Sequence, residues 1–188
     1  MKIYSQASLP MPAISAPWRL VLAIAGGSLL LAASAQIQVP FWPVPMTMQV
    51  TAVFLLAALA GGRLAAVMIL AYLAEGAMGL PVFAGGAAGA AALLGPTGGY
   101  LAGFAIAALA VGEWIRRARP RGAVGLVLPM TAGLALVYLC GALWLSRFVG
   151  WPAVLPAGVL PFLAGDIVKV LLAAGVAIAL RRDGKGGC

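Results

Sequence analysis

Hydrophobic positions run in long segments along the chain, and short breaks rich in glycine, proline or charge separate them. A helix that crosses the hydrocarbon core of a bilayer needs about 20 apolar residues. The pattern therefore predicts an all-α integral membrane protein with six transmembrane helices in one domain, residues 1–188. The expected spans are about 18–36, 47–61, 63–79, 99–115, 122–145 and 160–180, of which the second is short.

The composition agrees with a protein whose main solvent is lipid. Of the 188 residues, 64% are hydrophobic and 9% are charged, whereas a soluble domain has about 25% charged residues. The net charge of +8 raises the question of nucleic-acid binding. The basic residues lie at the ends of the expected helices and form no stripe with exposed aromatic residues, so we do not expect nucleic acid as a partner.

The basic residues also orient the expected helices. Cytoplasmic loops of membrane proteins are enriched in Lys and Arg. With the N-terminus inside, Arg147 is the one basic residue on the outer side, and Lys169 lies within the last span. We therefore expect a multi-pass protein of the cytoplasmic membrane with both termini in the cytoplasm. The basic residues on that side are Lys2, Arg19, Arg63, Arg116, Arg117, Arg119, Arg121, Arg181, Arg182 and Lys185.

An uncharged stretch, "GLPVFAGGAAGAAALLGPTGGY" at 79–100, follows the third expected span. The orientation places it outside the cell as a long, apolar, glycine-rich loop. Disordered segments are polar, so its apolar character argues against disorder. It either fills space at the membrane surface or closes over a pocket that opens to the outside, and the composition alone favours neither.

Two oppositely charged residues lie within the last expected span, in "LAGDIVKVLLAAGV". A lysine near the bilayer centre costs about 3 kcal/mol on insertion scales. Asp166 and Lys169 are three residues apart, so their side chains share one helix face. They form either an internal salt bridge or part of a site for a polar ligand. We favour the site, because apolar residues could replace a purely structural pair at little loss.

Other polar side chains are expected at a similar depth. Glu75 comes shortly before the outer end of the third span, and Tyr72 lies about one turn deeper on roughly the same face. Thr47 and Gln49 stand at the outer mouth of the second span. Together with Asp166, these residues predict a polar site formed by three helices.

Several kinds of chemistry are excluded by residues that the chain lacks. It contains no histidine, which excludes Ser–His and Cys–His catalysis and the HExxH metal site. It also contains no GxxxxGK[ST] phosphate loop, so ATP hydrolysis would have to take place in another subunit. An intramembrane enzyme that uses Glu75 and Asp166 remains an alternative, although neither lies in a YD or GxGD pattern. We expect no enzymatic activity, cofactor or metal.

Small residues recur at helical spacing in the first span. Ala23 and Gly27 form one pair, and Ser28 and Ala32 form another. Such pairs let helices approach closely. They serve packing within the bundle or contact with a partner membrane subunit, and packing is the commoner use.

Four motifs together resemble the BioY family, the biotin-binding S components of energy-coupling factor (ECF) transporters. They are "VPFWPVPMTMQ" at 39–49, "GLPVFAGG" at 79–86, "GPTGGYLAGF" at 95–104 and "GDIVKVLLA" at 165–173. The resemblance implies a six-helix protein that captures biotin from outside with high affinity. It also implies two kinds of partner, a transmembrane T subunit and two cytoplasmic ABC-type ATPase subunits. An S component for another small vitamin or precursor is the alternative.

The resemblance also implies roles for individual residues. Lys169 would bind an anionic or carbonyl group of biotin, and Asp166 an N–H of the ureido ring. The stretch at 79–100 would fold over the vitamin, with Leu80 as apolar cover. The family's AxxxA contact with the T subunit is matched imperfectly by the pairs Ala23–Gly27 and Ser28–Ala32. The secondary polar candidates are Thr47, Gln49, Tyr72, Glu75 and Tyr100, and the apolar walls are Phe41, Trp42 and Phe83.

Overall fold

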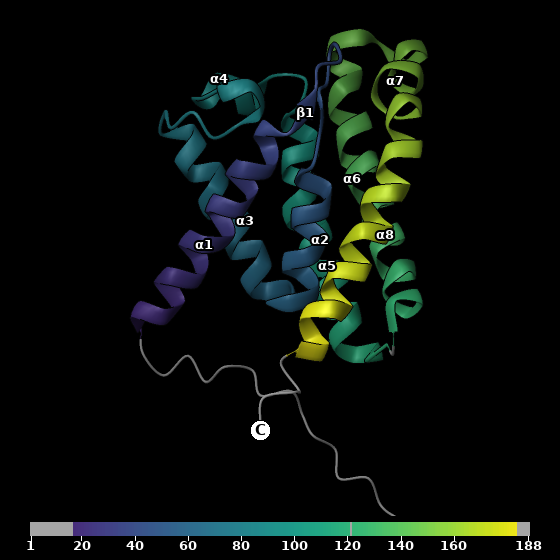
Figure 1. The fold of residues 1–188 in the computed structure, drawn as a ribbon. Coiled ribbons are helices and arrows are strands. Elements are labelled where there is room, and N and C mark those ends of the chain that lie inside the picture. Colours follow the sequence, from purple (N-terminus) through teal and green to yellow (C-terminus); the bar gives the residue numbers. More distant parts are fainter. Residues whose placement is uncertain (1–16, 121, 184–188) are drawn as a thin grey trace, which may run out of the picture.

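Helices make up most of the computed structural model, which describes residues 17–120 and 122–183 (Figure 1). Lys2, Arg121 and Lys185 lie outside the described residues, as does nearly all of the proline-rich segment 9–17. The long helices are α1 (Pro17–Gln36), α2 (Gln49–Leu59), α3 (Gly62–Ala77), α5 (Gly98–Ala118), α6 (Gly122–Val149) and α8 (Leu160–Asp183). The short elements are β1 (Gln38–Val39), β2 (Met46–Thr47), the 3-10 turn η1 (Ala84–Gly86), α4 (Ala90–Leu94) and α7 (Trp151–Gly158).

Each expected span coincides with a helix, but the helices differ in length. Four described stretches are long and apolar enough to cross a membrane: α1, α5, α6 and the combined stretch Trp151–Arg181. The helix α2 has 11 residues and is about 16 Å long at 1.5 Å per residue. The helix α3 has 16 residues. The sequence-based expectation that the second span is short is therefore confirmed.

The helix α2 begins two residues after the start expected for the second span, about residue 47. Residues 38–47 form a two-stranded antiparallel hairpin, in which Gln38 pairs with Thr47 and Val39 with Met46. Three prolines, at positions 40, 43 and 45, cannot donate a backbone hydrogen bond and break a helix that runs through them. The helix α2 therefore begins only at Gln49.

The expectation of an irregular loop at 79–100 is wrong in part. The stretch contains η1 and α4, and the amide of Gly89 donates a 2.7 Å hydrogen bond to the carbonyl oxygen of Gly76. Glycines at 79, 85, 86 and 89 adopt positive φ, which other residues rarely tolerate. Similarly, residues 151–158, which we expected to be a break, form α7 because a proline is accepted in the first turn of a helix.

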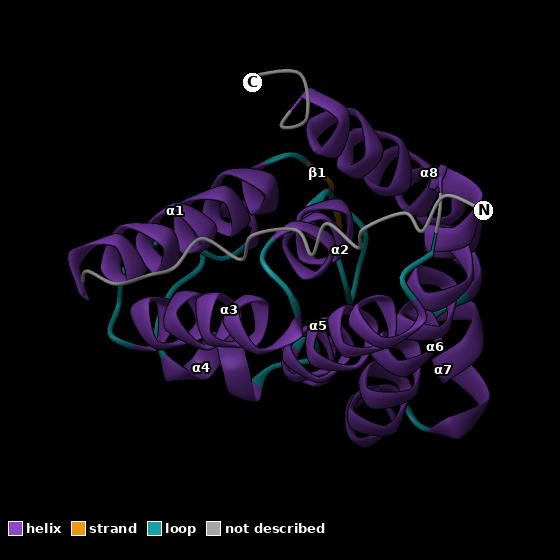
Figure 2. Cartoon of the chain, turned by 90° about the horizontal axis from the view of Figure 1, so that it is seen from below, coloured by secondary structure: helices purple, strands orange, loops and turns teal. Residues whose placement is uncertain are grey.

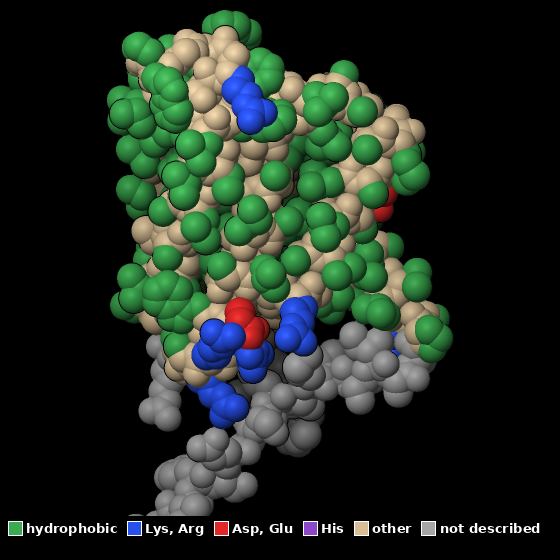
Figure 3. All heavy atoms as spheres, turned by 180° about the vertical axis from the view of Figure 1, so that it is seen from behind, with side chains coloured by type: hydrophobic (Ala, Val, Ile, Leu, Met, Phe, Trp, Pro, Cys, Tyr) green, Lys and Arg blue, Asp and Glu red, His purple; other side chains and the backbone are tan. Residues whose placement is uncertain are grey.

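Successive long helices alternate in direction, so the short elements gather at one end (Figure 1). The hairpin, α4 and α7 lie at this end, which we call the hairpin end. Figure 3 shows most basic side chains at the opposite end and a single basic side chain near the hairpin end. Hydrophobic side chains cover the surface between the two ends. Among the described residues, the one basic residue at the hairpin end is Arg147, in the last turn of α6.

The helix α5 lies at the centre of the packing. It contacts α2, α3 and α6, and Figure 2 shows it between α3 and α6 in a view along the bundle. Glycines permit these contacts, since a Cβ on Gly112 would overlap the backbone of Gly62, and one on Gly133 would overlap Val111 and Phe54. Close approach at small residues is the usual way in which helices associate where water provides no driving force.

The contact between α3 and α5 provides a test of this packing. In Gly112→Leu, the added side chain overlaps the backbone of Gly62, which cannot move aside as a flexible side chain would. We expect a loss of at least about 1–3 kcal/mol, the usual cost of overpacking, seen as a lower midpoint of thermal unfolding in detergent by circular dichroism. The matched control is Gly26→Leu, because nothing lies within 4 Å of a Cβ at that position. An equal loss in both variants would contradict the account.

Candidate functional site

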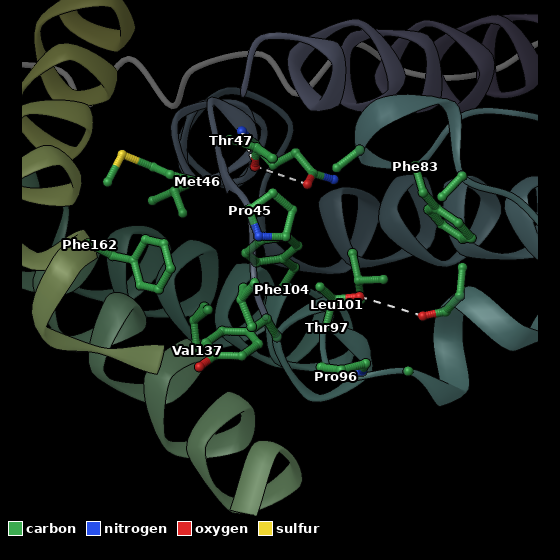
Figure 4. Close-up of a pocket in the computed structure, with 18 of the residues that line it drawn as sticks. Pro45, Met46, Thr47, Phe83, Pro96, Thr97, Leu101, Phe104, Val137 and Phe162 are labelled. Atoms are coloured by element: carbon green, nitrogen blue, oxygen red, sulfur yellow. Dashed lines mark hydrogen bonds between the residues drawn. The ribbon is translucent and has the colours of Figure 1, made fainter. Parts of the chain in front are cut away.

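A cavity of about 360 Å³ lies near the hairpin end (Figure 4). Its volume falls within the range of about 300–1,000 Å³ that is typical of small-molecule sites. Figure 4 shows Phe162 and Phe83 on opposite sides, with Phe104 and Val137 between them. The lining consists of 44–47, Gln49 and Val50; Phe83, Ala84, Ala87, Ala91, Ala92 and 95–97; Tyr100, Leu101 and Phe104 of α5; Val137 and Tyr138 of α6; and Phe162, Asp166 and Lys169 of α8.

A buried ion pair forms the polar part of the α8 wall. The Lys169 Nζ donates to Asp166 Oδ1 at 2.6 Å, and the Tyr138 hydroxyl donates to Oδ2 at 2.7 Å. Asp166 and Lys169 are 4% and 7% exposed, which is rare for charged residues unless they are paired. The prediction that they share one helix face is confirmed. Tyr138 was not predicted, because the sequence does not show how α6 is rotated against α8.

The ion pair retains binding capacity beyond its internal bonds. A lysine ammonium has three donors, and in the described part of the chain Lys169 uses one of them, toward Asp166. Each carboxylate oxygen of Asp166 accepts one hydrogen bond and can accept another. In an apolar cavity, these free donors and acceptors would bind the carbonyl, carboxylate or N–H groups of a ligand.

A second polar group comes from the start of α2. Thr47 Oγ1 donates to Gln49 Oε1 at 3.0 Å, and Gln49 Nε2 donates to the Tyr72 hydroxyl at 2.9 Å. That hydroxyl donates in turn to the carbonyl oxygen of Val82 at 3.2 Å. Thr47 and Gln49 line the cavity, whereas Tyr72 lies behind them and orients the Gln49 amide.

The stretch 79–100 forms one wall of the cavity and is held on two sides. On one side, Phe83 is buried with its ring edge-on to Tyr72 at 5.4 Å, and Gln36 Nε2 donates to its carbonyl oxygen at 3.0 Å. On the other side, Trp144 Nε1 donates to the carbonyl oxygen of Gly95 at 2.9 Å. The stretch therefore provides part of the cavity wall. Leu80, which is half exposed, does not line the cavity.

The aromatic candidates lie at different distances from the cavity. Tyr100 lines it, but its hydroxyl donates to the carbonyl oxygen of Gly158 at 2.8 Å and so holds α7 against α5. Phe41 packs edge-on against the lining residue Phe162, with ring centroids 6.0 Å apart. Trp42 is 88% exposed and does not line the cavity.

Glu75 does not line the cavity. Its carboxylate accepts a hydrogen bond from the hydroxyl of Ser28 on α1. Glu75 and Asp166 therefore do not face one space, and a two-carboxylate enzyme site has no geometric basis here. A similar depth in the membrane was the reason for grouping them, and depth does not determine the direction in which a side chain points.

The small residues of α1 face the bundle. Ser28 is buried beside Glu75, and a Cβ on Gly27 would overlap Met68 of α3. Ala23 and Ala32 are partly buried against the same core. Of the two uses expected for these residues, the geometry is that of packing within the chain.

Comparison with known proteins identifies the family. The sequence model of the BioY family matches residues 6–185, which is nearly the whole chain. The chain belongs to the BioY family. The family resemblance expected from the four motifs is thereby confirmed.

Individual relatives agree with this assignment. The chain is 44% identical over 155 residues to a probable biotin transporter BioY of Pyrococcus horikoshii, covering 82% of this chain and 90% of the relative. It is 36% identical over 154 residues to the biotin transporter BioY of Thermotoga maritima, covering 81% and 90%. The crystal structure of the S-component for biotin from an ECF-type ABC transporter is similar with a TM-score of 0.80 and 25% identity, covering 90% of this chain and 94% of that one.

The buried ion pair gives a prediction about stability without ligand. Lys169→Met removes the main partner of a buried carboxylate, which typically costs about 3–5 kcal/mol. The double variant Asp166→Leu/Lys169→Met removes both charges, so we expect it to lose less stability than the single variant. Unfolding of Lys169→Met, Asp166→Leu and the double variant in detergent, followed by circular dichroism, measures the three losses. If the losses of the two single variants simply add up to that of the double variant, the two charges do not depend on each other.

Proposed function

We propose that this chain is an S component that captures biotin at the outer face of the cytoplasmic membrane for uptake. The helices α1, α2, α3, α5, α6 and α8 cross the membrane in this proposal, and both termini lie in the cytoplasm. The hairpin end then faces outward, because the opposite end carries most of the described basic residues and basic residues favour the cytoplasmic side. The stretch 79–100 is extracellular.

The observation that carries the proposal is the ion pair of Asp166 and Lys169 in the wall of a largely apolar cavity. Biotin combines a ureido group, which donates and accepts hydrogen bonds, with an apolar thioether ring and a carboxylate on an apolar tail. The free donors of Lys169 suit a carbonyl or carboxylate oxygen of this ligand, and Asp166 suits a ureido N–H. Phe83, Phe104 and Phe162 provide apolar surface for the remaining atoms. Relatives named as biotin transporters support this ligand.

The stretch 79–100 would act as the cover of the bound vitamin. It forms part of the cavity wall and is held by side chains of α1, α3 and α6. Of the glycines with positive φ, Gly79 precedes the wall residues and Gly89 lies between them, and such positions commonly absorb the backbone rotation of a moving loop. Biotin would enter when this cover swings away from the hairpin end.

Transport would require partner proteins. The family is one of transporter components rather than enzymes, and the sequence contains no phosphate-binding loop. A transmembrane T subunit and two ABC-type ATPase subunits would supply the energy. Because the small residues of α1 face inward, a T subunit would meet this helix on its exposed side, which includes Leu22, Gly26 and Leu29.

Exchange of single carboxylates tests the site. Asp166→Asn replaces the carboxylate by a neutral amide. The variant loses the charge that pairs with Lys169 and that would accept a hydrogen bond from the ligand. We expect biotin affinity to fall at least about tenfold, since a hydrogen bond to a charged group contributes about 1.5–3 kcal/mol. Glu75→Gln is the matched control, because Glu75 is also an intrahelical acid but does not line the cavity. Titration with labelled biotin in detergent gives both affinities.

Two outcomes would count against the proposal. An equal loss of affinity in both variants would show that the cavity is not where biotin binds. If the wild-type protein bound a different vitamin in a competition panel and was not saturated by biotin, it would be an S component for that vitamin.

A further inference from the structure

A second cavity, of about 250 Å³, lies beside the cavity described above and shares no lining residue with it. Its walls are apolar: Leu73 of α3, Leu93 of α4, Trp144 of α6, and Gly98, Gly99 and Ala102 of α5. Ala102 is exposed, and Leu73, Leu93 and Trp144 are half-buried. The cavity therefore opens on the outer surface of the bundle, and we call it the α5 groove.

Two glycines of α5 line the groove and let its other walls, Leu93 and Trp144, lie close against the helix backbone. A Cβ on Gly98 would overlap the backbone of Leu93, and one on Gly99 would overlap the side chain of Trp144. Residues 98–102 cover about 6 Å along α5 at 1.5 Å per residue. A partner's helix is about 10 Å wide with its side chains, so a groove this short suits a hydrocarbon chain better.

A cation stands at the edge of the same groove. The guanidinium carbon of Arg147 lies 4.7 Å from the centre of the Trp144 ring, and Trp144 lines the groove. Arg147 is exposed, and the salt bridges of the described residues do not include it. Among the described residues, Arg147 is also the one basic residue at the hairpin end. An apolar groove beside an unneutralised cation is complementary to a molecule with an acyl chain and an anionic head.

We propose that the α5 groove binds one acyl chain of an anionic phospholipid and that Arg147 binds the phosphate of the same lipid. The site depends on the membrane placement proposed above and not on the identity of the vitamin. It adjoins the ligand cavity through Trp144, whose Nε1 holds the cavity-lining residue Gly95.

Fluorescence of Trp144 reports directly on the groove. In the full-length chain, Trp18, Trp42, Trp114 and Trp151 are exposed, so each can be changed to Phe to leave Trp144 as the one tryptophan. This protein is placed in two preparations of phosphatidylcholine nanodiscs. One contains a small fraction of brominated phosphatidylglycerol, and the other contains the same fraction of brominated phosphatidylcholine. Bromine quenches tryptophan on contact. We expect phosphatidylglycerol to associate about fivefold more strongly, the factor for one basic residue beside anionic lipid.

Three further variants separate the head-group contact from the chain contact. Arg147→Gln should bring the two lipids to equal quenching. Ala102→Phe should fill the groove and weaken quenching by both lipids. Ile106→Phe is the matched control, since Ile106 is exposed one turn further along α5 and does not line the groove, and it should change nothing.

Equal quenching by the two lipids in the starting protein would overturn the proposal, as would a preference that persists in Arg147→Gln. Exclusion of both brominated lipids would also overturn it and would leave a partner's helix as the occupant. Biotin titration of the same preparations tests the vitamin site separately, because the two cavities share no lining residue.

Discussion

A lysine and a carboxylate inside an apolar helix bundle are costly unless they are paired, because lipid offers neither charge a polar partner. The pair of Asp166 and Lys169 meets this constraint on one face of α8, and Tyr138 of α6 donates a second hydrogen bond to the carboxylate. Two helices must therefore keep a fixed rotation relative to each other. The same pair gives an otherwise apolar cavity its hydrogen-bonding groups, so one interaction serves both the packing and the proposed binding of biotin.

The bundle positions this pair through close contacts rather than through large side chains. Gly112 brings α5 against the start of α3, and Gly141 and Gly158 accommodate the Tyr100 ring between α5, α6 and α7. These contacts leave a cavity open near the hairpin end. The stretch 79–100 completes that cavity and is held by the hydrogen bonds of Gln36, Tyr72 and Trp144. Tyr72 also accepts a hydrogen bond from the amide of Gln49, so one side chain joins the cavity wall at α2 to the stretch 79–100.

The sequence predicted the helices and the shared helix face of Asp166 and Lys169, but it did not predict which neighbouring helix each side chain faces. Long apolar runs indicate where the helices lie along the chain. A separation of three residues places Asp166 and Lys169 on one helix face. Depth along a helix does not fix which neighbour a side chain faces, so Glu75 was grouped with the cavity although it faces Ser28. For the same reason Tyr138 was missed. The turns within 79–100 depend on glycines at positive φ, and glycine-rich sequence alone does not show which of them adopt it.

In the proposed function, the cavity near the hairpin end binds biotin without any partner protein. Equilibrium titration of the purified full-length chain with biotin, together with mass spectrometry of small molecules released on denaturation, tests it most directly. The account predicts saturable binding of one biotin per chain at nanomolar concentrations, or biotin that co-purifies and is released. A folded chain that neither carries biotin nor is saturated by it would contradict the account.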